Sequence, residues 1–326
     1  MNKHPGATVF HTAAWLAALE RTYGYRPRAL TTAPPASPAL ADGLVFCEIR
    51  SPWTGRRLVS LPFSDYCGPL GDDAGLLTRE ALALTKNGGF RYLEIRPGYD
   101  AKPPDGMAEG ASFYRHTIDL AAGPETLYRN LHKDSIARKI RRAGREGLRI
   151  GRETDRSAIR EFHRLFLVTR RRHGYPPPPV QWLDNLFATH ADAASLHLAR
   201  KPDGQAVAGM VLLRHSRTIY YKYGASDERF HAMGGMPLLF WDAMESAHQA
   251  GFETLDLGRS DLDGAGLIEF KEKLGASGKR ISYWRYPSVT AGAKGHTGEA
   301  VRKWCCAHLP DSALAWAGAR LYPHIG

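Results

Sequence analysis

One short stretch of the chain, residues 251–275, carries the charged side chains that are best spaced for chemistry. It predicts a strand, a polar break and a helix, on which Leu267, Phe270 and Leu274 recur at helical spacing. Lys271 falls within the same apolar arc. A lysine there either extends its stem to water or neutralises a negative group in a cleft. The second interpretation is a cation directed at a phosphate or at a developing oxyanion.

Two more charged residues, Arg259 and Asp261, follow the predicted strand at its carboxyl end. Strand ends of this kind are where open sheets bind ligands. Arg259 could therefore support Lys271 in holding negative charge, and Asp261 could take up a proton. The alternative for Asp261 is structural, since aspartate is a common cap for the helix that follows it.

Adjacent glycines, Gly234 and Gly235, precede a helix that we expect between Pro237 and Gln249. Glycines at such a position let backbone N–H groups approach a pyrophosphate at the helix N-terminus. A plain turn before the helix is an equal alternative. The strand before this loop, residues 218–223, is expected to place Tyr221 and Tyr223 on one face.

The middle of the chain carries a strongly basic helix, predicted over residues 132–147. Its arginines, including Arg138, Arg141 and Arg142, could lie along phosphate groups. A helix face that is merely solvated is the alternative. The segment has no interleaved aromatic residues and no RNA-binding signature, which argues against sequence-specific recognition of nucleic acid.

In the first half, a polar and aromatic loop over residues 64–69 follows a predicted strand. It contains Asp65 and Tyr66, and it would suit the rim of a substrate site. A purely structural loop is the other interpretation.

Length and composition indicate a globular protein of two domains, since 326 residues exceed one small core. No apolar run is long enough to span a membrane, and the N-terminus lacks the apolar region of a signal peptide. The four cysteines have no disulfide or metal-site spacing. We therefore expect a cytoplasmic protein without a metal. The net charge of +11 favours anionic partners such as nucleotides, phosphates, nucleic acid or the inner leaflet.

The two halves of the chain share a pattern. Residues 89–95 and 251–257 have matching Gly, Phe and Leu positions, and each segment ends a predicted strand–strand–helix–strand unit. Two copies of one unit explain this economically.

The 251–275 stretch also resembles the FemAB-like acyltransferases, which consist of two GNAT folds in tandem. Their pattern is similar to F-K-x-x-F-G, which Phe270, Lys271 and Gly275 match here, while Leu274 replaces the second aromatic residue. The resemblance implies an α/β protein with two tandem GNAT-like domains, each a mixed sheet flanked by helices. We expect the first domain at 1–120, the second at 121–290 and a helical tail at 291–326, which could pack on the first domain.

For the site, the resemblance implies that Lys271 and Arg259 act as cations and that Asp261 or Asp65 takes the proton of an acceptor amine. Tyr66 would lie near the acceptor. Lys222 and Tyr223 lie on a strand that lines the transfer cleft in this family. Arg138, Arg141 and Arg142 would lie near a polyanionic substrate, and Gly234 and Gly235 near the phosphates of a donor.

We therefore expect an acyltransferase or aminoacyltransferase without a bound cofactor. Its donor would be acyl-CoA or aminoacyl-tRNA, and its acceptor an amine of a peptidoglycan or exopolysaccharide precursor, phosphate-bearing or lipid-linked. Ile95-Arg96-Pro97 replaces the I-D-P of peptidoglycan-type members, which removes a carboxylate from the acceptor region. Peripheral contact with the anionic inner face of a membrane is compatible with the charge. The rival hypothesis is a non-catalytic protein that binds nucleic acid or anionic lipid through residues 132–147.

Overall fold

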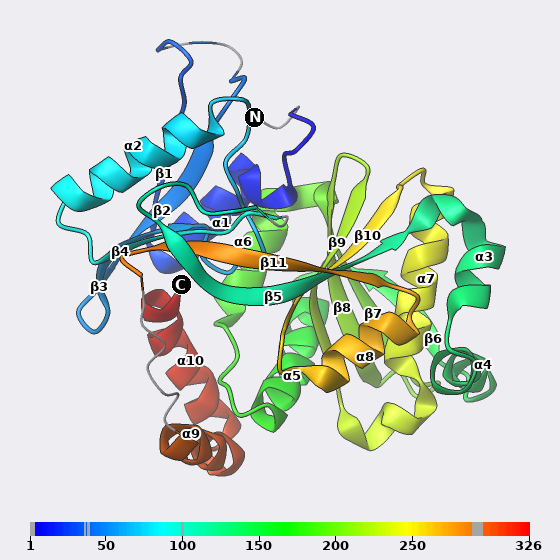
Figure 1. The fold of residues 1–326 in the computed structure, drawn as a ribbon. Helices are drawn as coiled ribbons and strands as arrows, with labels where there is room; N and C mark the ends of the chain where they lie inside the picture. The colour runs from blue at the N-terminus through cyan, green and yellow to red at the C-terminus, as the bar shows by residue number, and fades with distance from the viewer. Residues whose placement is uncertain (1–3, 36, 38–39, 99–100, 289–295) are drawn as a thin grey trace. The chain divides into compact units, whose positions relative to one another are not determined.

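The structure is a computed structural model that describes residues 4–35, 37, 40–98, 101–288 and 296–326, with side chains from 301 onward in the last range (Figure 1). These residues form two compact units. Unit 1 contains the described residues of 1–115, 279–294 and 320–326, and unit 2 contains those of 116–278 and 295–319.

The domain boundaries expected from sequence differ from these units. The chain divides at 115/116 rather than 120/121, inside strand β5 (Ala108–Asp119). Residues 279–288, which we expected in the second domain, belong to unit 1 with most of β11 (Ser277–Tyr286), because β11 pairs antiparallel with β4 (Tyr92–Ile95). The expected tail is also divided, and its residues 291–295 lie outside the described part.

Unit 1 is organised around β2 (Leu44–Ser51), which pairs antiparallel with β1 (Arg26–Leu30) and with β3 (Gly55–Ser60). Helix α2 (Ala74–Asn87) then crosses over, so that β4 pairs in parallel with β3. The buried face of α2 joins Leu58 and Leu93 in one core cluster. Before these elements come a 3-10 turn, Val9–His11, and α1 (Ala13–Tyr23).

Unit 2 contains an antiparallel series in the order β6 (Arg149–Glu153), β7 (Ala194–Arg200), β8 (Ala206–His215) and β9 (Thr218–Ser226). Helix α7 (Gly235–Gln249) crosses over to β10 (Thr254–Asp261), which is parallel to β9. The other α-helices of the unit are α3 (Gly123–Asn130), α4 (Arg138–Arg145), α5 (Arg156–Arg172), α6 (Val180–His190), α8 (Ala265–Lys273), α9 (His296–His308) and α10 (Asp311–Ile325), whose last residues belong to unit 1. Shorter turns are Leu120–Ala122, Lys133–Ala137, Ala191–Ala193 and Glu228–Met233.

The internal repeat is present in both units. β2, β3, α2 and β4 follow the same course as β8, β9, α7 and β10, with an antiparallel pair, a crossover helix and a parallel strand. The segments that echo each other in sequence are the parallel strands β4 and β10. The predicted tandem α/β architecture is thus confirmed.

Helices cover both faces of the unit 2 sheet. Ala208, Met210 and Leu212 of β8 join a core cluster with Phe240 of α7. Gly209, which points the other way, faces Phe162 of α5, because a side chain added there would meet its ring. α5 and α7 therefore pack on opposite faces.

A bulge in β9 overturns one prediction. Val211 pairs with Tyr223 and Leu212 with Tyr221, so Lys222 is an extra residue that shifts the alternation. As a result Tyr221 contacts Phe240 of α7, and Tyr223 contacts Phe166 of α5. The two tyrosines lie on opposite faces, not on one face as the sequence alternation predicts.

None of the helices within the described ranges is both long enough and apolar enough to cross a membrane. The cysteines are free thiols, of which Cys47, Cys67 and Cys306 are buried. Across the described residues, no three His, Cys, Asp or Glu side chains gather in a way that could hold a metal ion.

Candidate functional site

Strands β9 and β10 separate soon after they begin. They pair only through residues 218–220 and 254–256, although β9 continues to Ser226 and β10 to Asp261. The separation leaves an opening in the sheet of unit 2. Leu267 and Phe270 of α8 lie beside this opening, and Phe270 also packs edge-on against Phe240.

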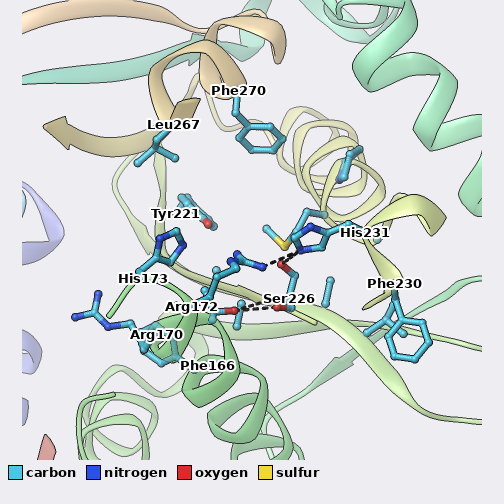
Figure 2. A pocket seen from close by; sticks show the side chains of 18 of the residues that line it. Phe166, Arg170, Arg172, His173, Tyr221, Ser226, Phe230, His231, Leu267 and Phe270 are labelled. Carbon is cyan, nitrogen blue, oxygen red and sulfur yellow. Dashed lines mark hydrogen bonds between the residues drawn. The ribbon is translucent and has the colours of Figure 1, made fainter. Parts of the chain in front are cut away.

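A cavity of about 430 Å³ occupies this region, between the end of β9, the start of α7, the last turns of α5 and the helix α8. Figure 2 shows Leu267 and Phe270 across the cavity from Phe166. Much of the wall is apolar, and it consists of Phe166, Val207, Ala208, Tyr221, Ala225, Met236, Pro237, Leu267 and Phe270. The lining also contains five basic side chains, which are Lys139, Arg170, Arg172, His173 and His231.

His231 is held in a defined protonation state. Its Nε2 lies 3.2 Å from Nη1 of Arg172 and 2.9 Å from Oγ of Ser226, as Figure 2 shows. A guanidinium group can only donate hydrogen bonds, so Nε2 presents its lone pair. Burial, followed by the charge of Arg172, lowers the pKa of His231 below its usual 6.5. Burial and the neighbouring arginines also lower the pKa of His173. Both rings are therefore neutral at pH 7 in this structure.

The glycine loop brings α4 to the mouth of the cavity. Gly234 has φ +80° and no room for a side chain, since an added Cβ would lie 2.4 Å from the carbonyl oxygen of Lys139. Gly235 lines the cavity, and α7 begins there without a side-chain cap. The first N–H groups of a helix have no partner within it, which favours an anion at this end. The expected position of both glycines at a phosphate-binding loop stays a prediction.

Lys271 is buried, with 2% of its surface exposed, so the alternative in which its stem extends to water is wrong. Its ammonium donates hydrogen bonds of 3.1 Å to the carbonyls of both Gly258 and Arg259. These carbonyls belong to the part of β10 that has separated from β9. Lys271 does not line the cavity, although Phe270 beside it does.

Arg259 is half-buried, and Asp261 is exposed at the end of β10. Gly264, not Asp261, occupies the cap position of α8, and its N–H donates to the backbone carbonyl of Asp261. The helix-cap interpretation of Asp261 is therefore wrong.

Lys222 and Tyr223 lie at the bulge in β9. Tyr223 accepts a hydrogen bond of 2.8 Å from the indole of Trp182, and the Lys222 ammonium lies 5.4 Å from the centre of the Tyr223 ring. Neither residue lines the cavity. The hydrogen bond from Trp182 gives Tyr223 a packing role between β9 and α6.

The basic helix is shorter than predicted, because a π turn at Lys133–Ala137 precedes α4. Arg138, Arg141 and Arg142 are all exposed. Arg141 donates to the hydroxyl of Tyr128, and Arg142 forms an ion pair of 3.1 Å with Glu146. Of this helix, the cavity lining includes only Lys139.

Asp65 and Tyr66 belong to unit 1. The backbone carbonyl of Asp65 accepts a hydrogen bond of 2.6 Å from the hydroxyl of Tyr283. Tyr66 is only 3% exposed, and the Arg115 guanidinium lies 4.1 Å from the centre of its ring. Tyr66 is thus part of the packed interior of unit 1, whereas the side chain of Asp65 is partly exposed.

The structure adds functional candidates that the sequence analysis missed. Arg170 and Arg172 lie in the last turn of α5. Because cations commonly stabilise this end of a helix, a run of arginines there does not by itself indicate a binding site. His231 lies three residues before Gly234, and its position in the glycine loop was the signal available. The contact between α4 and Gly234, which brings Lys139 to the cavity, has no local signature.

Comparison with known proteins agrees with this geometry. The acetyltransferase (GNAT) domain family matches residues 130–272. FemX has a similar structure, with TM-score 0.69 and 15% identity over 87% of this chain and 93% of that one. A tandem GNAT protein from the clavulanic acid biosynthesis pathway has TM-score 0.54 and 13% identity, over 88% and 92% of the two chains. L-PGS from Bacillus licheniformis has TM-score 0.52 and 16% identity, over 90% and 94%. No curated protein matches the sequence.

The separating strands and the family match over residues 130–272 indicate a GNAT-type acyltransferase domain in unit 2, and the repeat gives unit 1 the same order of elements. The two GNAT-like units follow each other in one chain, and this fold is similar to that of FemX over 87% of the chain. The family match favours an enzyme over the non-catalytic rival.

Proposed function

We propose that this acyltransferase binds a phosphate-bearing acyl donor, in the first instance an acyl-CoA, in the cavity of unit 2 and transfers the acyl group to an amine of a cell-envelope precursor. The observation that carries the proposal is the composition of that cavity. It combines an apolar wall with Lys139, Arg170 and Arg172 at the uncapped start of α7.

This combination suits a molecule with two chemically different ends. Phosphates would be held by the arginines and by the N–H groups of the first turn of α7. The uncharged arm that carries a thioester would pass along Tyr221, Leu267 and Phe270. One of the structural neighbours is described with reference to AcCoA, which is consistent with such a donor.

In the proposed reaction the acceptor amine attacks the thioester carbonyl, and its nitrogen forms the new bond to the acyl carbon. The carbon–sulfur bond breaks when the tetrahedral intermediate collapses. The amine loses a proton and the leaving thiolate gains one, so no other reactant is needed. The enzyme would contribute positioning and stabilisation of charge.

Several residues keep proposed roles. The Lys271 ammonium, buried where β10 leaves β9, would hold the β10 segment of Arg259 in place for the developing oxyanion. Asp261, exposed at the end of that strand, would take the amine proton. In unit 2, Lys222 and Tyr223 are proposed to help to define the acceptor side. For unit 1 by itself, Asp65 and Tyr66 keep a proposed role in binding an acceptor.

Aminoacyl-tRNA is the second donor candidate, and the exposed row of Arg138, Arg141 and Arg142 favours it. These side chains share α4 with Lys139, so a polyanion in the cavity could continue over the helix. A further structural neighbour is the C-terminal domain of a putative lysylphosphatidylglycerol synthetase, and the phospholipid in that name supports a cell-envelope acceptor.

The decisive experiment is calorimetric titration with coenzyme A. We expect binding by the wild type and loss of about tenfold or more in affinity for Arg172→Gln, because one charge-assisted contact is removed. Arg164→Gln is the matched control, since Arg164 lies on the same helix, is exposed and does not line the cavity. Equal loss in both variants, or no binding by the wild type, would contradict a coenzyme A donor. Binding of tRNA alone would favour the second candidate.

A further inference from the structure

The last two helices carry an unusual number of exposed apolar side chains. In unit 2, Trp304 is 63% exposed, Trp316 is 64% exposed and Val301 is 59% exposed. Large aromatic side chains are usually buried, because their apolar area is costly in water. Two tryptophans exposed on neighbouring helices therefore indicate a surface that is covered in use.

These helices are firmly attached through their other faces. Cys306 and Leu314 are buried in one cluster with Leu167 of α5. Arg171 of α5 donates hydrogen bonds to the backbone carbonyls of Cys306, Ala307 and Leu309, at 3.1, 3.1 and 2.7 Å. It therefore satisfies carbonyls that the end of α9 leaves unpaired. The exposed tryptophans belong to a docked element, not to a loose tail.

On α9 the exposed residues form one stripe. Val301, Trp304 and His308 recur at spacings of three and four, opposite the buried Cys306. The rings of Trp304 and His308 stack at 4.7 Å, and Nδ1 of His308 donates to the carbonyl oxygen of Trp304. The indole is thus held on the outer side of the helix.

The charge of this segment is positive. Among residues 301–326, the basic side chains are Arg302, Lys303 and Arg320. The acidic one is Asp311, which forms an ion pair of 2.5 Å with Arg171. Lys303, next to Trp304, is exposed. Arg302 is engaged on the docked side, because its Nη1 donates to the carbonyl of Gly174 and its guanidinium lies 3.7 Å from the centre of the Tyr175 ring. An exposed indole beside an exposed lysine is the composition of helices that lie in the interface of an anionic bilayer.

We propose that the outer faces of α9 and of the unit 2 part of α10 bind the surface of an anionic lipid bilayer through Trp304, Trp316 and Lys303. The cores of protein interfaces are depleted of lysine, which favours lipid over a protein partner. The dense row of cations that a nucleic acid requires lies on α4 instead. The inference does not depend on the donor in the cavity, and it would bring the enzyme to a lipid-linked acceptor.

The test is co-sedimentation of the full chain with vesicles of phosphatidylglycerol and phosphatidylethanolamine, compared with phosphatidylcholine vesicles. We expect binding to the anionic vesicles and about tenfold weaker binding by the W304S/W316S double variant, since interfacial affinity follows buried apolar area. Trp53→Ser is the matched control, because Trp53 is equally exposed, at 63%, on unit 1. It should bind like the wild type. Brominated lipids should quench the fluorescence of the wild type and of Trp53→Ser, and much less that of W304S/W316S.

The outcomes separate the alternatives. Failure of the wild type to bind, or equal binding by W304S/W316S, would overturn the proposal. A dimer that W304S/W316S dissociates, without vesicle binding, would assign the face to a second copy of the chain. Retained coenzyme A affinity in W304S/W316S would show that the variant is folded. It would also keep the result separate from the donor proposal.

Discussion

The ammonium group of Lys271 lies 3.1 Å from the carbonyl oxygens of both Gly258 and Arg259. It thereby connects α8 to β10 at the point where β10 has left its partner strand β9. A buried lysine with these partners stabilises the geometry of the open sheet, and the cavity depends on that geometry because α8 supplies Leu267 and Phe270.

Removal of this ammonium should destabilise unit 2. Lys271→Met removes two buried hydrogen bonds to backbone carbonyls, so we expect a loss of about 2 kcal/mol in the free energy of unfolding. Lys273→Met, which removes only an i,i+4 pair with Glu269, should cost less than about 0.5 kcal/mol. Urea denaturation measures both. If Lys271→Met keeps its stability but loses turnover, Lys271 acts on the reacting groups and is not a structural anchor.

The close approach of α4 to the glycine loop should make Gly234 sensitive to substitution. Gly234→Ala must place a Cβ against the carbonyl of Lys139, in addition to the strain of φ +80°. Gly251→Ala has the same φ but open space around it, so it measures the backbone strain alone. We expect Gly251→Ala to cost about 1 kcal/mol and Gly234→Ala considerably more. Similar melting temperatures for the two variants would mean that α4 moves away from residue 234 with no cost in the free energy of unfolding.

Donor binding should strengthen as the pH falls from about 8 to about 6.5. In the empty cavity, burial and Arg172 hold the pKa of His231 below 6.5. A bound phosphate favours the imidazolium form and raises that pKa, so binding takes up a proton and is favoured at lower pH. Calorimetry in buffers of different ionisation enthalpy measures this uptake. His231→Gln should reduce it, and unchanged uptake would locate the proton elsewhere.

The arginine row on α4 should distinguish a large polyanion from a small donor. In the variant R138S/R141S, we expect tRNA binding to weaken. The slope of the logarithm of its association constant against the logarithm of the salt concentration should fall in magnitude by about 2. Coenzyme A affinity should change little, because neither side chain lines the cavity. A strong loss of coenzyme A affinity would instead place the phosphates of the donor on this helix.

Local sequence patterns were sufficient for several of the regular elements. The helix expected between Pro237 and Gln249 is α7, and the repeated segments 89–95 and 251–257 correctly indicated two copies of one unit. The strands β1, β5, β7 and β11 were not predicted. Two of them, β5 and β11, contain the divisions between the units, which explains the misplaced boundaries.

The sequence by itself determined the class of fold, the glycine loop before α7 and the exceptional position of Lys271 on its helix. These features depend on the spacing of residues within one segment, which can be read directly from the sequence. Only the tertiary structure decided that Lys271 bonds to β10, that a bulge turns Tyr223 away from Tyr221, and that Lys139, Arg172 and His231 share one cavity. Such relationships come from segments far apart in the chain, and they are fixed by packing and strand register.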